Sequence, residues 1–131
     1  MPLSSISERA FTQEVLESPI PVLVHFWAPW CGLCRLINPL LMRYQAEWAD
    51  SLKIVSFNAD QSLKIANTYR LKNLPTLILF VGGKIRLRID GFQGREDLRQ
   101  ALETITLNYA QHSSTLWVQP QDKQSYQKNW I

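Results

Sequence analysis

Both cysteines of the chain lie in one segment, FWAPWCGLCRLINP at residues 26–39, with two residues between them. The apolar run VLVHFW at 22–27 leads into this segment and lacks the alternation of a half-exposed strand. Such a run is typical of a strand that is buried on both faces of a parallel sheet. After Cys31, apolar side chains recur at helical spacing as far as about Ala49. The cysteine pair is therefore predicted to join a buried strand to the start of a helix.

The other elements follow from similar patterns of spacing, caps and turns. Gly82 and Gly83 between two apolar runs predict a hairpin, and the alternation of Arg86 and Arg88 with apolar residues places its second strand at a sheet edge. Strands that alternate with helices indicate an α/β domain, with a central mixed sheet of four to five strands flanked by helices. The remaining predicted elements are a helix at 5–17 capped by Ser7 or Ser5, a strand at 52–58, a helix at about 60–70 with Leu63, Ala66 and Tyr69 inward, and a helix at 95–105.

Length and composition limit the functional classes. The chain has 131 residues, within the usual size of one domain, and 46 % of them are hydrophobic. No apolar run reaches the roughly 18 residues of a membrane span, and the N-terminus lacks a signal-peptide pattern. We therefore expect a cytoplasmic monomer with no membrane contact. The mild net charge of +3, without a basic stripe interleaved with aromatics, argues against nucleic-acid binding.

The character of the sequence changes at about Thr106. The segment 106–131 contains five glutamines, only three charged residues and aromatics without a period. We expect a domain at 1–105 followed by a polar, Gln-rich C-terminal tail at 106–131. Docking of Leu116, Trp117 and Val118 on the domain could order part of this tail.

Two thiols this close together could bind a metal, form a structural disulfide or act as a reversible redox couple. A structural zinc site usually takes four ligands, and only His25 and His112 could complete one. An iron–sulfur cluster could be shared by cysteines from two chains. The position between a strand and a helix favours a redox couple instead, because cytosolic thiols are kept reduced and a structural disulfide is unusual there. We expect no metal and no cofactor.

The start of the helix gives the two cysteines different roles. Unpaired backbone N–H groups and the positive end of the helix dipole stabilise a thiolate at Cys31. Cys34, one turn into the helix, is expected to be more buried and to close back on Cys31, which expels a mixed disulfide. Gly32 keeps the space over Cys31 open, and Trp30 offers a flat apolar surface beside it.

Three stretches of the chain resemble the thioredoxin family. VHFWAPWCGLCRLINP is similar to the family's strand-to-helix segment around W-C-G-P-C, NLPTLILFVGG to its strand with a cis-proline followed by Thr, and DGFQGREDLRQAL to its final glycine and helix. The resemblance covers about residues 5–105. It implies a thioredoxin fold, with Cys31 as the attacking thiol, Cys34 as the resolving thiol and Pro75 as the cis-proline facing them. It also implies a groove for a substrate backbone, bordered by Trp30, Gly32, Leu33, Leu74, Pro75 and Gly91.

Three positions depart from the family pattern. Leu33 stands where the family usually has Pro, His25 replaces its buried Asp, and Ser56 replaces a Lys that usually neighbours that Asp. A buried imidazole prefers to be neutral, because desolvation disfavours its charged form. Neutral His25 could therefore accept the proton of Cys34. The alternative is a core histidine that is hydrogen-bonded to backbone.

Two functions of different classes fit these features. The first is a thiol–disulfide oxidoreductase that uses the Cys31/Cys34 couple on protein disulfides and receives electrons from a thioredoxin reductase or another donor. The second is a thioredoxin-fold binding or regulatory module, in which the groove and the tail hold a partner and thiol turnover is incidental. The altered charges beneath the cysteines and the aromatic tail motivate the second function. Reductant and oxidant both remain open within the first, because potentials of such couples vary widely.

Overall fold

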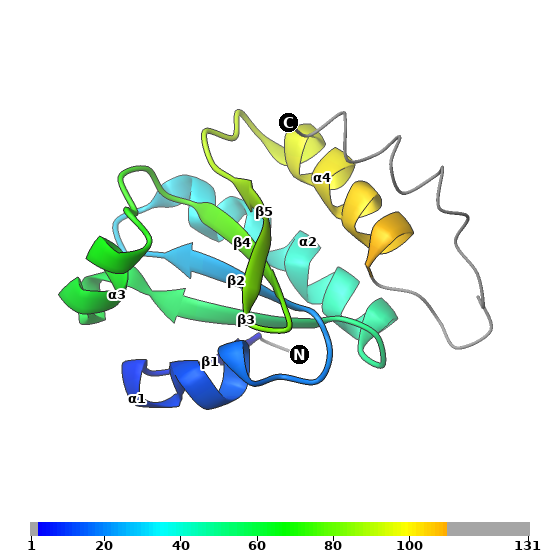
Figure 1. The fold of residues 1–131 in the computed structure, drawn as a ribbon. Helices are drawn as coiled ribbons and strands as arrows, with labels where there is room; N and C mark the ends of the chain where they lie inside the picture. Colours follow the sequence, from blue (N-terminus) through cyan, green and yellow to red (C-terminus); the bar gives the residue numbers. More distant parts are fainter. Residues whose placement is uncertain (1–2, 110–131) are drawn as a thin grey trace.

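The computed structural model describes residues 3–109, which form a five-stranded sheet with helices on both faces (Figure 1). This arrangement confirms the predicted mixed sheet flanked by helices. In chain order the elements are β1 (Ser4–Ser5), α1 (Glu8–Phe11), the π-helix η1 (Thr12–Leu16), β2 (Val22–Trp27), α2 (Gly32–Trp48), β3 (Lys53–Asn58), the 3₁₀ turn η2 (Ala59–Gln61), α3 (Leu63–Thr68), β4 (Thr76–Val81), β5 (Lys84–Ile89) and α4 (Arg95–Asn108).

Strand β2 lies at the centre of the sheet, whose order is β1-β3-β2-β4-β5. β1 and β2 run parallel to β3, whereas β4 is antiparallel to both β2 and β5. The first five residues of β2 are buried, as expected for a strand covered on both faces. Because side chains alternate along a strand, His25 shares a face with Leu23, while Val24 and Phe26 point to the other face.

Each face of the sheet has its own apolar core. Leu23, Ile54 and Leu79 pack with residues of α2 and α4 on one face. On the other face, α1, η1 and α3 cover an aromatic group centred on Phe11. The ring of Phe11 lies 5.6–6.4 Å from four other rings, those of Phe26, Phe57, Tyr69 and Phe80. His25 therefore belongs to the layer between the sheet and α2.

The N-terminal segment differs from the prediction. The helix begins at Glu8 and not at Ser5, and Ser7 caps it by accepting the backbone N–H of Ala10 at 3.3 Å. Ser4 and Ser5 instead form β1, which pairs with Val55 and Ser56 of β3. The edge of β3 offers unpaired backbone groups to residues 4–5. Pairing with this distant strand is more favourable than a further helical turn at Ser5.

The predicted inward position of Leu63 is wrong. Leu63 is 79 % exposed, and Ile65 of the same helix is buried in its place. The hydroxyl of Ser62 caps the helix by accepting the N–H of Ile65 at 3.1 Å, so Leu63 is the first helical residue. Because the helix starts at Leu63, its buried side carries Ile65, and Tyr69 packs against the same core.

The hairpin of β4 and β5 forms as predicted, and β5 lies at the edge of the sheet. Gly82 and Gly83 both have positive φ angles, +60° and +81°. A Cβ atom on Gly83 would lie 2.9 Å from the carbonyl oxygen of Leu16, so this position needs glycine for space as well as for its backbone conformation.

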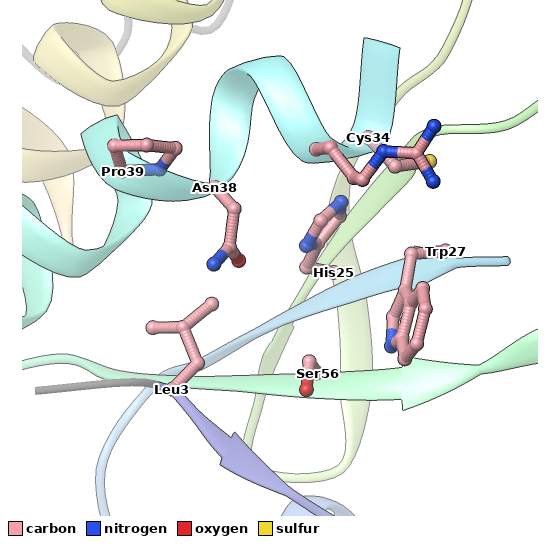
Figure 2. Close-up of a pocket in the computed structure, with 8 residues that line it drawn as sticks. Leu3, His25, Trp27, Cys34, Asn38, Pro39 and Ser56 are labelled. Atoms are coloured by element: carbon pink, nitrogen blue, oxygen red, sulfur yellow. The ribbon is translucent and has the colours of Figure 1, made fainter. Parts of the chain in front are cut away.

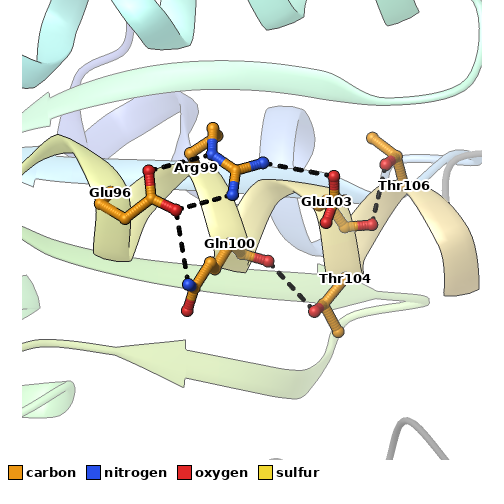
Figure 3. Close-up of polar contacts among 6 residues, drawn as sticks. All are labelled: Glu96, Arg99, Gln100, Glu103, Thr104 and Thr106. Carbon is orange, nitrogen blue, oxygen red and sulfur yellow. Dashed lines mark hydrogen bonds and ion pairs between the residues drawn. The ribbon is translucent and has the colours of Figure 1, made fainter.

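Helix α4 continues three residues beyond Ile105, where the sequence placed the end of the domain. Asn108 is buried and donates to the carbonyl oxygen of Thr104 at 2.9 Å. The exposed side of α4 carries a run of polar contacts, in which Arg99 pairs with Glu96 at 2.6 Å and with Glu103 at 3.4 Å (Figure 3). Such pairs at helical spacing each add modest support to the helix.

The predicted docking of Leu116, Trp117 and Val118 lies outside the described residues, as does His112. Within residues 3–109, no helix is long and apolar enough to cross a membrane.

Candidate active site

Cys31 and Cys34 form a disulfide at the start of α2, with their Cα atoms 5.3 Å apart. Cys31 is the N-cap residue of the helix, and its sulfur accepts the backbone N–H of Cys34 at 3.1 Å. The N–H of Cys31 in turn donates to the carbonyl of Ala28 at 3.0 Å, which closes the turn between β2 and α2. The first sulfur therefore lies where helix N–H groups can stabilise a thiolate, as the sequence predicted.

Both cysteines are buried in this disulfide form. Their exposed fractions are 5 % for Cys31 and 2 % for Cys34, so the expected difference in accessibility has the predicted sign but is small. Gly32 is exposed, and a Cβ atom there would have no neighbour within 4 Å. The space beside the disulfide at Gly32 is therefore open to an incoming molecule.

Trp30 presents a large apolar surface beside the disulfide. The residue is 67 % exposed, and its indole N–H donates to the carboxylate of Asp60 at 3.1 and 3.4 Å. Asp60 comes from the turn η2 after β3 and was not predicted as a site residue. Its carboxylate orients the indole, and no local pattern could reveal a bond between residues 30 positions apart.

Pro75 follows a cis peptide bond from Leu74, as the resemblance implied. Thr76, the next residue, pairs with Phe26 near the end of β2, which brings Pro75 to the same end of the sheet as the cysteines. Leu77 pairs with Ile89, and Pro75 and Gly91 each lie two residues beyond this last pair, at the same end of the hairpin. Gly91 is exposed with a φ of +70° and open space around it.

Leu33 and Leu74, the two other residues expected at the groove, are both half-buried. Leu33 packs against the core between the sheet and α2, whereas Leu74 packs against the aromatic core on the opposite face. Neither side chain is wholly available to a client.

His25 lies beneath the disulfide, between β2 and α2, and is only 2 % exposed (Figure 2). Its strand neighbours are Ser56 on β3 and Leu77 on β4. Neither ring nitrogen has a hydrogen-bond partner among the described residues. The alternative of a core histidine bonded to backbone is therefore not what the structure shows. Burial lowers the pKa of His25 to about 4, so the imidazole is neutral at ordinary pH.

One cavity of about 290 Å³ joins His25 to the resolving cysteine. Figure 2 shows His25 pointing from β2 towards Cys34 on α2, with Ser56 and Trp27 on the strand side. The cavity is lined by Leu3, His25, Trp27, Cys34, Arg35, Asn38, Pro39 and Ser56. None of these residues is a carboxylate, so the wall of this cavity holds no acid that could replace the one expected from the resemblance.

Trp27, Arg35 and Asn38 were not predicted as site residues. The indole N–H of Trp27 also lacks a partner among the described residues, and Arg35 donates to the carbonyl of Pro29 at 2.6 Å. Asn38 could have been found from sequence, because it follows Cys34 by four residues and so lies on the same side of the helix.

Within residues 3–109, no three or more His, Cys, Asp or Glu side chains gather closely enough to hold a metal ion. The arrangement consists of a sulfur pair at a helix start, an exposed aromatic surface, a cis-proline and a neutral buried imidazole. These groups suit a two-electron exchange between thiols and a disulfide.

Comparison with known proteins agrees with this chemistry. The thioredoxin family model matches residues 2–104. Thioredoxin 1 of Nostoc sp. is 37 % identical over 100 residues, which cover 76 % of this chain and 94 % of the relative. Chloroplastic M-type thioredoxin of Chlamydomonas reinhardtii is 40 % identical over 76 % of this chain and 71 % of its own length. Chloroplastic thioredoxin M4 of Arabidopsis thaliana is also 40 % identical, but the match spans only 51 % of that longer protein.

Proposed function

Because the chain belongs to the thioredoxin family and is a dithiol–disulfide oxidoreductase, we propose that it exchanges disulfides with protein clients, with Cys31 attacking and Cys34 resolving. The observation that carries this assignment is the hydrogen bond from the Cys34 N–H to the Cys31 sulfur at the N-cap of α2. The first sulfur alone has this support, and a thiolate there is the better nucleophile at neutral pH.

The reaction starts with the reduced pair. The Cys31 thiolate attacks one sulfur of a client disulfide, forms a mixed disulfide and releases a client thiolate, which takes up a proton. Cys34 then loses its proton and attacks the Cys31 sulfur, which forms the Cys31–Cys34 disulfide and releases the second client thiolate. Two electrons pass to the client. An electron donor such as a thioredoxin reductase must return two electrons to the pair before the next cycle.

His25 is the proton acceptor for Cys34 in this scheme. Both groups line the same cavity, and the imidazole is neutral and without a hydrogen-bond partner among the described residues. Transfer of the Cys34 proton creates an imidazolium next to a thiolate. The thiolate favours the charged imidazole and offsets part of the desolvation that lowers its pKa. Trp27 and Ser56 offer further polar atoms around this pair.

The client backbone lies in the groove bordered by Trp30, Gly32, Leu33, Leu74, Pro75 and Gly91. The exposed indole of Trp30 supplies apolar contact, and the open space at Gly32 and Gly91 lets a backbone approach. Pro75 has no N–H, so an extended client pairs with the carbonyl of Leu74. All of these groups come from one chain, so the proposed groove needs no second subunit.

The working compartment is one that keeps thiols reduced, such as the cytoplasm, because the couple must be re-reduced in each cycle. Two of the relatives are chloroplastic thioredoxins, which makes a plastid the competing location. Fractionation of cells that express the tagged full chain distinguishes the two.

Trapping of mixed disulfides tests the assignment of the two thiols. Cys34→Ser retains the nucleophile but cannot resolve, so it should accumulate mixed disulfides with client proteins through Cys31. Cys31→Ser is the matched control and should trap none. Diagonal gels of both variants give the result, and trapping by Cys31→Ser would reverse the assignment.

Reduction of insulin disulfides by dithiothreitol separates this function from a binding module. The oxidoreductase accelerates insulin precipitation above the rate with dithiothreitol alone. An unaccelerated rate, with the cysteine pair titrated as reduced, would favour the binding or regulatory module.

A further inference from the structure

Arg88, on the edge strand β5, binds three separate groups through one guanidinium. Nη1 donates to the carbonyl oxygen of Tyr69, Nη2 to that of Arg70 at 2.9 Å, and Nε to the carboxylate of Asp90 at 3.2 Å. The planar fork of arginine suits such parallel bonds, which a lysine cannot reproduce. A single side chain therefore links β5 to a segment that lies 18 residues earlier in the chain.

The two carbonyls belong to the turn that ends α3. The N–H of Leu71 donates to the carbonyl of Ala66, and the N–H of Arg70 to that of Asn67, which is the pattern of a Schellman motif. Arg70 occupies its left-handed position with a φ of 50°, where glycine is the usual residue. The Arg88 guanidinium thus binds the carbonyls of Tyr69 and Arg70 where the backbone conformation is unfavourable for a side chain.

This turn leads directly into one wall of the client groove. The turn is separated from Leu74 and the cis-proline only by residues 71–73, of which Lys72 and Asn73 are exposed. Asp90, the other partner of Arg88, immediately precedes Gly91 on the facing wall. Leu77 and Ile89 are the last paired residues at this end of the hairpin, and Pro75 and Gly91 each lie two residues beyond them. Arg88 therefore contacts the segments that carry both walls.

We propose that Arg88 is a positioning residue that sets the separation of the two groove walls, and thereby controls reactivity towards protein disulfides. This inference rests on the proposed function, in which a client backbone lies between Leu74–Pro75 and Gly91. Among the described residues, the hydrogen bonds and the ion pair of the Arg88 side chain reach neither cysteine nor His25. Its effect therefore falls on docking of the polypeptide and leaves the thiol chemistry unchanged.

Whether substitution of Arg88 changes the reaction rate depends on the class of disulfide substrate. A protein disulfide must place its backbone between both walls, so a wall displaced by a fraction of an ångström lowers its rate. A small aromatic disulfide such as 5,5′-dithiobis(2-nitrobenzoate) needs only to reach the Cys31 sulfur and does not need both walls. The ratio of the two rates is a readout that a general loss of folding would not change selectively.

The test compares Arg88→Gln with Arg86→Gln, a matched control on the same strand. Arg86 is exposed and has no hydrogen bond or ion pair in the described residues. We expect Arg88→Gln to lower the second-order rate constant for insulin about three- to tenfold, with the rate for 5,5′-dithiobis(2-nitrobenzoate) and the midpoint potential unchanged. Arg86→Gln should match the parent in all three measurements. Arg88→Lys, which retains the charge but not the fork, should fall between parent and Arg88→Gln for insulin.

Equal insulin rates for the parent, Arg88→Gln and Arg86→Gln would overturn the positioning role. An equal loss with both disulfides would also overturn it, since that outcome reports damage to the thiol pair or to the fold. If Arg88→Gln does not fold, the insulin rate of Arg88→Lys decides the question alone. A parent that reduces the small disulfide but not insulin would instead refute the proposed function, and with it the groove that Arg88 is proposed to position.

Discussion

Cys34 and His25 line the same cavity from opposite sides, the cysteine from α2 and the histidine from β2. The imidazole is desolvated and has no hydrogen-bond partner among residues 3–109. In the proposed mechanism, this relationship supplies a proton acceptor for the resolving thiol without a buried carboxylate. It also makes His25 the residue whose substitution should separate the two steps of disulfide exchange.

His25→Ala should slow resolution of a preformed Cys31 mixed disulfide by about tenfold or more near neutral pH, because general-base assistance is lost. The initial attack by Cys31 should change less, since Cys31 does not line the cavity. Stopped-flow measurement of the two steps distinguishes them. Equal resolution rates for His25→Ala and the parent from about pH 6 to pH 9, where thiolate formation by Cys34 limits the step, would reduce His25 to a packing role.

Acid should destabilise the parent through the same histidine. Burial lowers the folded-state pKa of His25 from 6.5 to about 4, so the unfolded chain binds more protons between these two values. Stability from this group is therefore fully present above about pH 6.5 and is lost as the pH falls towards 4, by an order of 3 kcal/mol. Urea unfolding of the parent and His25→Leu at several pH values measures the difference.

The carboxylates contribute equally to both proteins, so the comparison isolates His25. As the pH decreases over this range, the free energy of unfolding of the parent should fall relative to that of His25→Leu. Parallel pH profiles for the two proteins would contradict the neutral buried imidazole.

Leu33→Pro should lower the midpoint potential of the pair, by about 30 mV if the change is worth roughly 1.4 kcal/mol. Leu33 lies in the first turn of α2, and its backbone N–H stands between the two cysteines in the chain, where proline would remove it. An N–H there favours the thiolate, and so makes the parent couple more oxidising. Proline is compatible with a first helical turn, so the fold should survive.

A glutathione redox titration of both proteins gives the two potentials. Leu33→Ala serves as the control, because it removes the packing of the side chain but retains the N–H. An unchanged or higher potential in Leu33→Pro would exclude the N–H effect, as would an equal fall in Leu33→Ala.

Removal of residues 110–131 should leave the melting temperature within a few degrees of the full chain. A polar, Gln-rich segment buries little apolar surface, and residues 3–109 contain an apolar core on each face of the sheet. Removal from Thr106 onwards should cost more, because it also deletes the last turn of α4 with the buried Asn108. Thermal unfolding of both shortened chains and the full chain measures this, and a large fall on removal of 110–131 would point to docking by Leu116 and Trp117.

The local features of the site were predictable from the sequence. The run from Val22 to Trp27 and the helical spacing after Cys31 determine a buried strand followed by a helix, and this order alone places Cys31 at the helix N-terminus. The two glycines at 82–83 likewise determine the hairpin, because their positive φ angles suit few other residues. In each case the signal lies within a few residues, and neighbouring apolar patterns agree with it.

Only the tertiary structure decided which distant groups meet. Strand register sets Ser56 beside His25, chain packing brings Asp60 to the indole of Trp30, and β5 carries Arg88 to the carbonyls after α3. Leu63 also shows this limit. The sequence predicted it to point inward, but the helix begins at Leu63 after the Ser62 cap, and Ile65 is buried instead. Such contacts depend on the relative placement of elements far apart in the chain, and residue spacing contains no information about that placement.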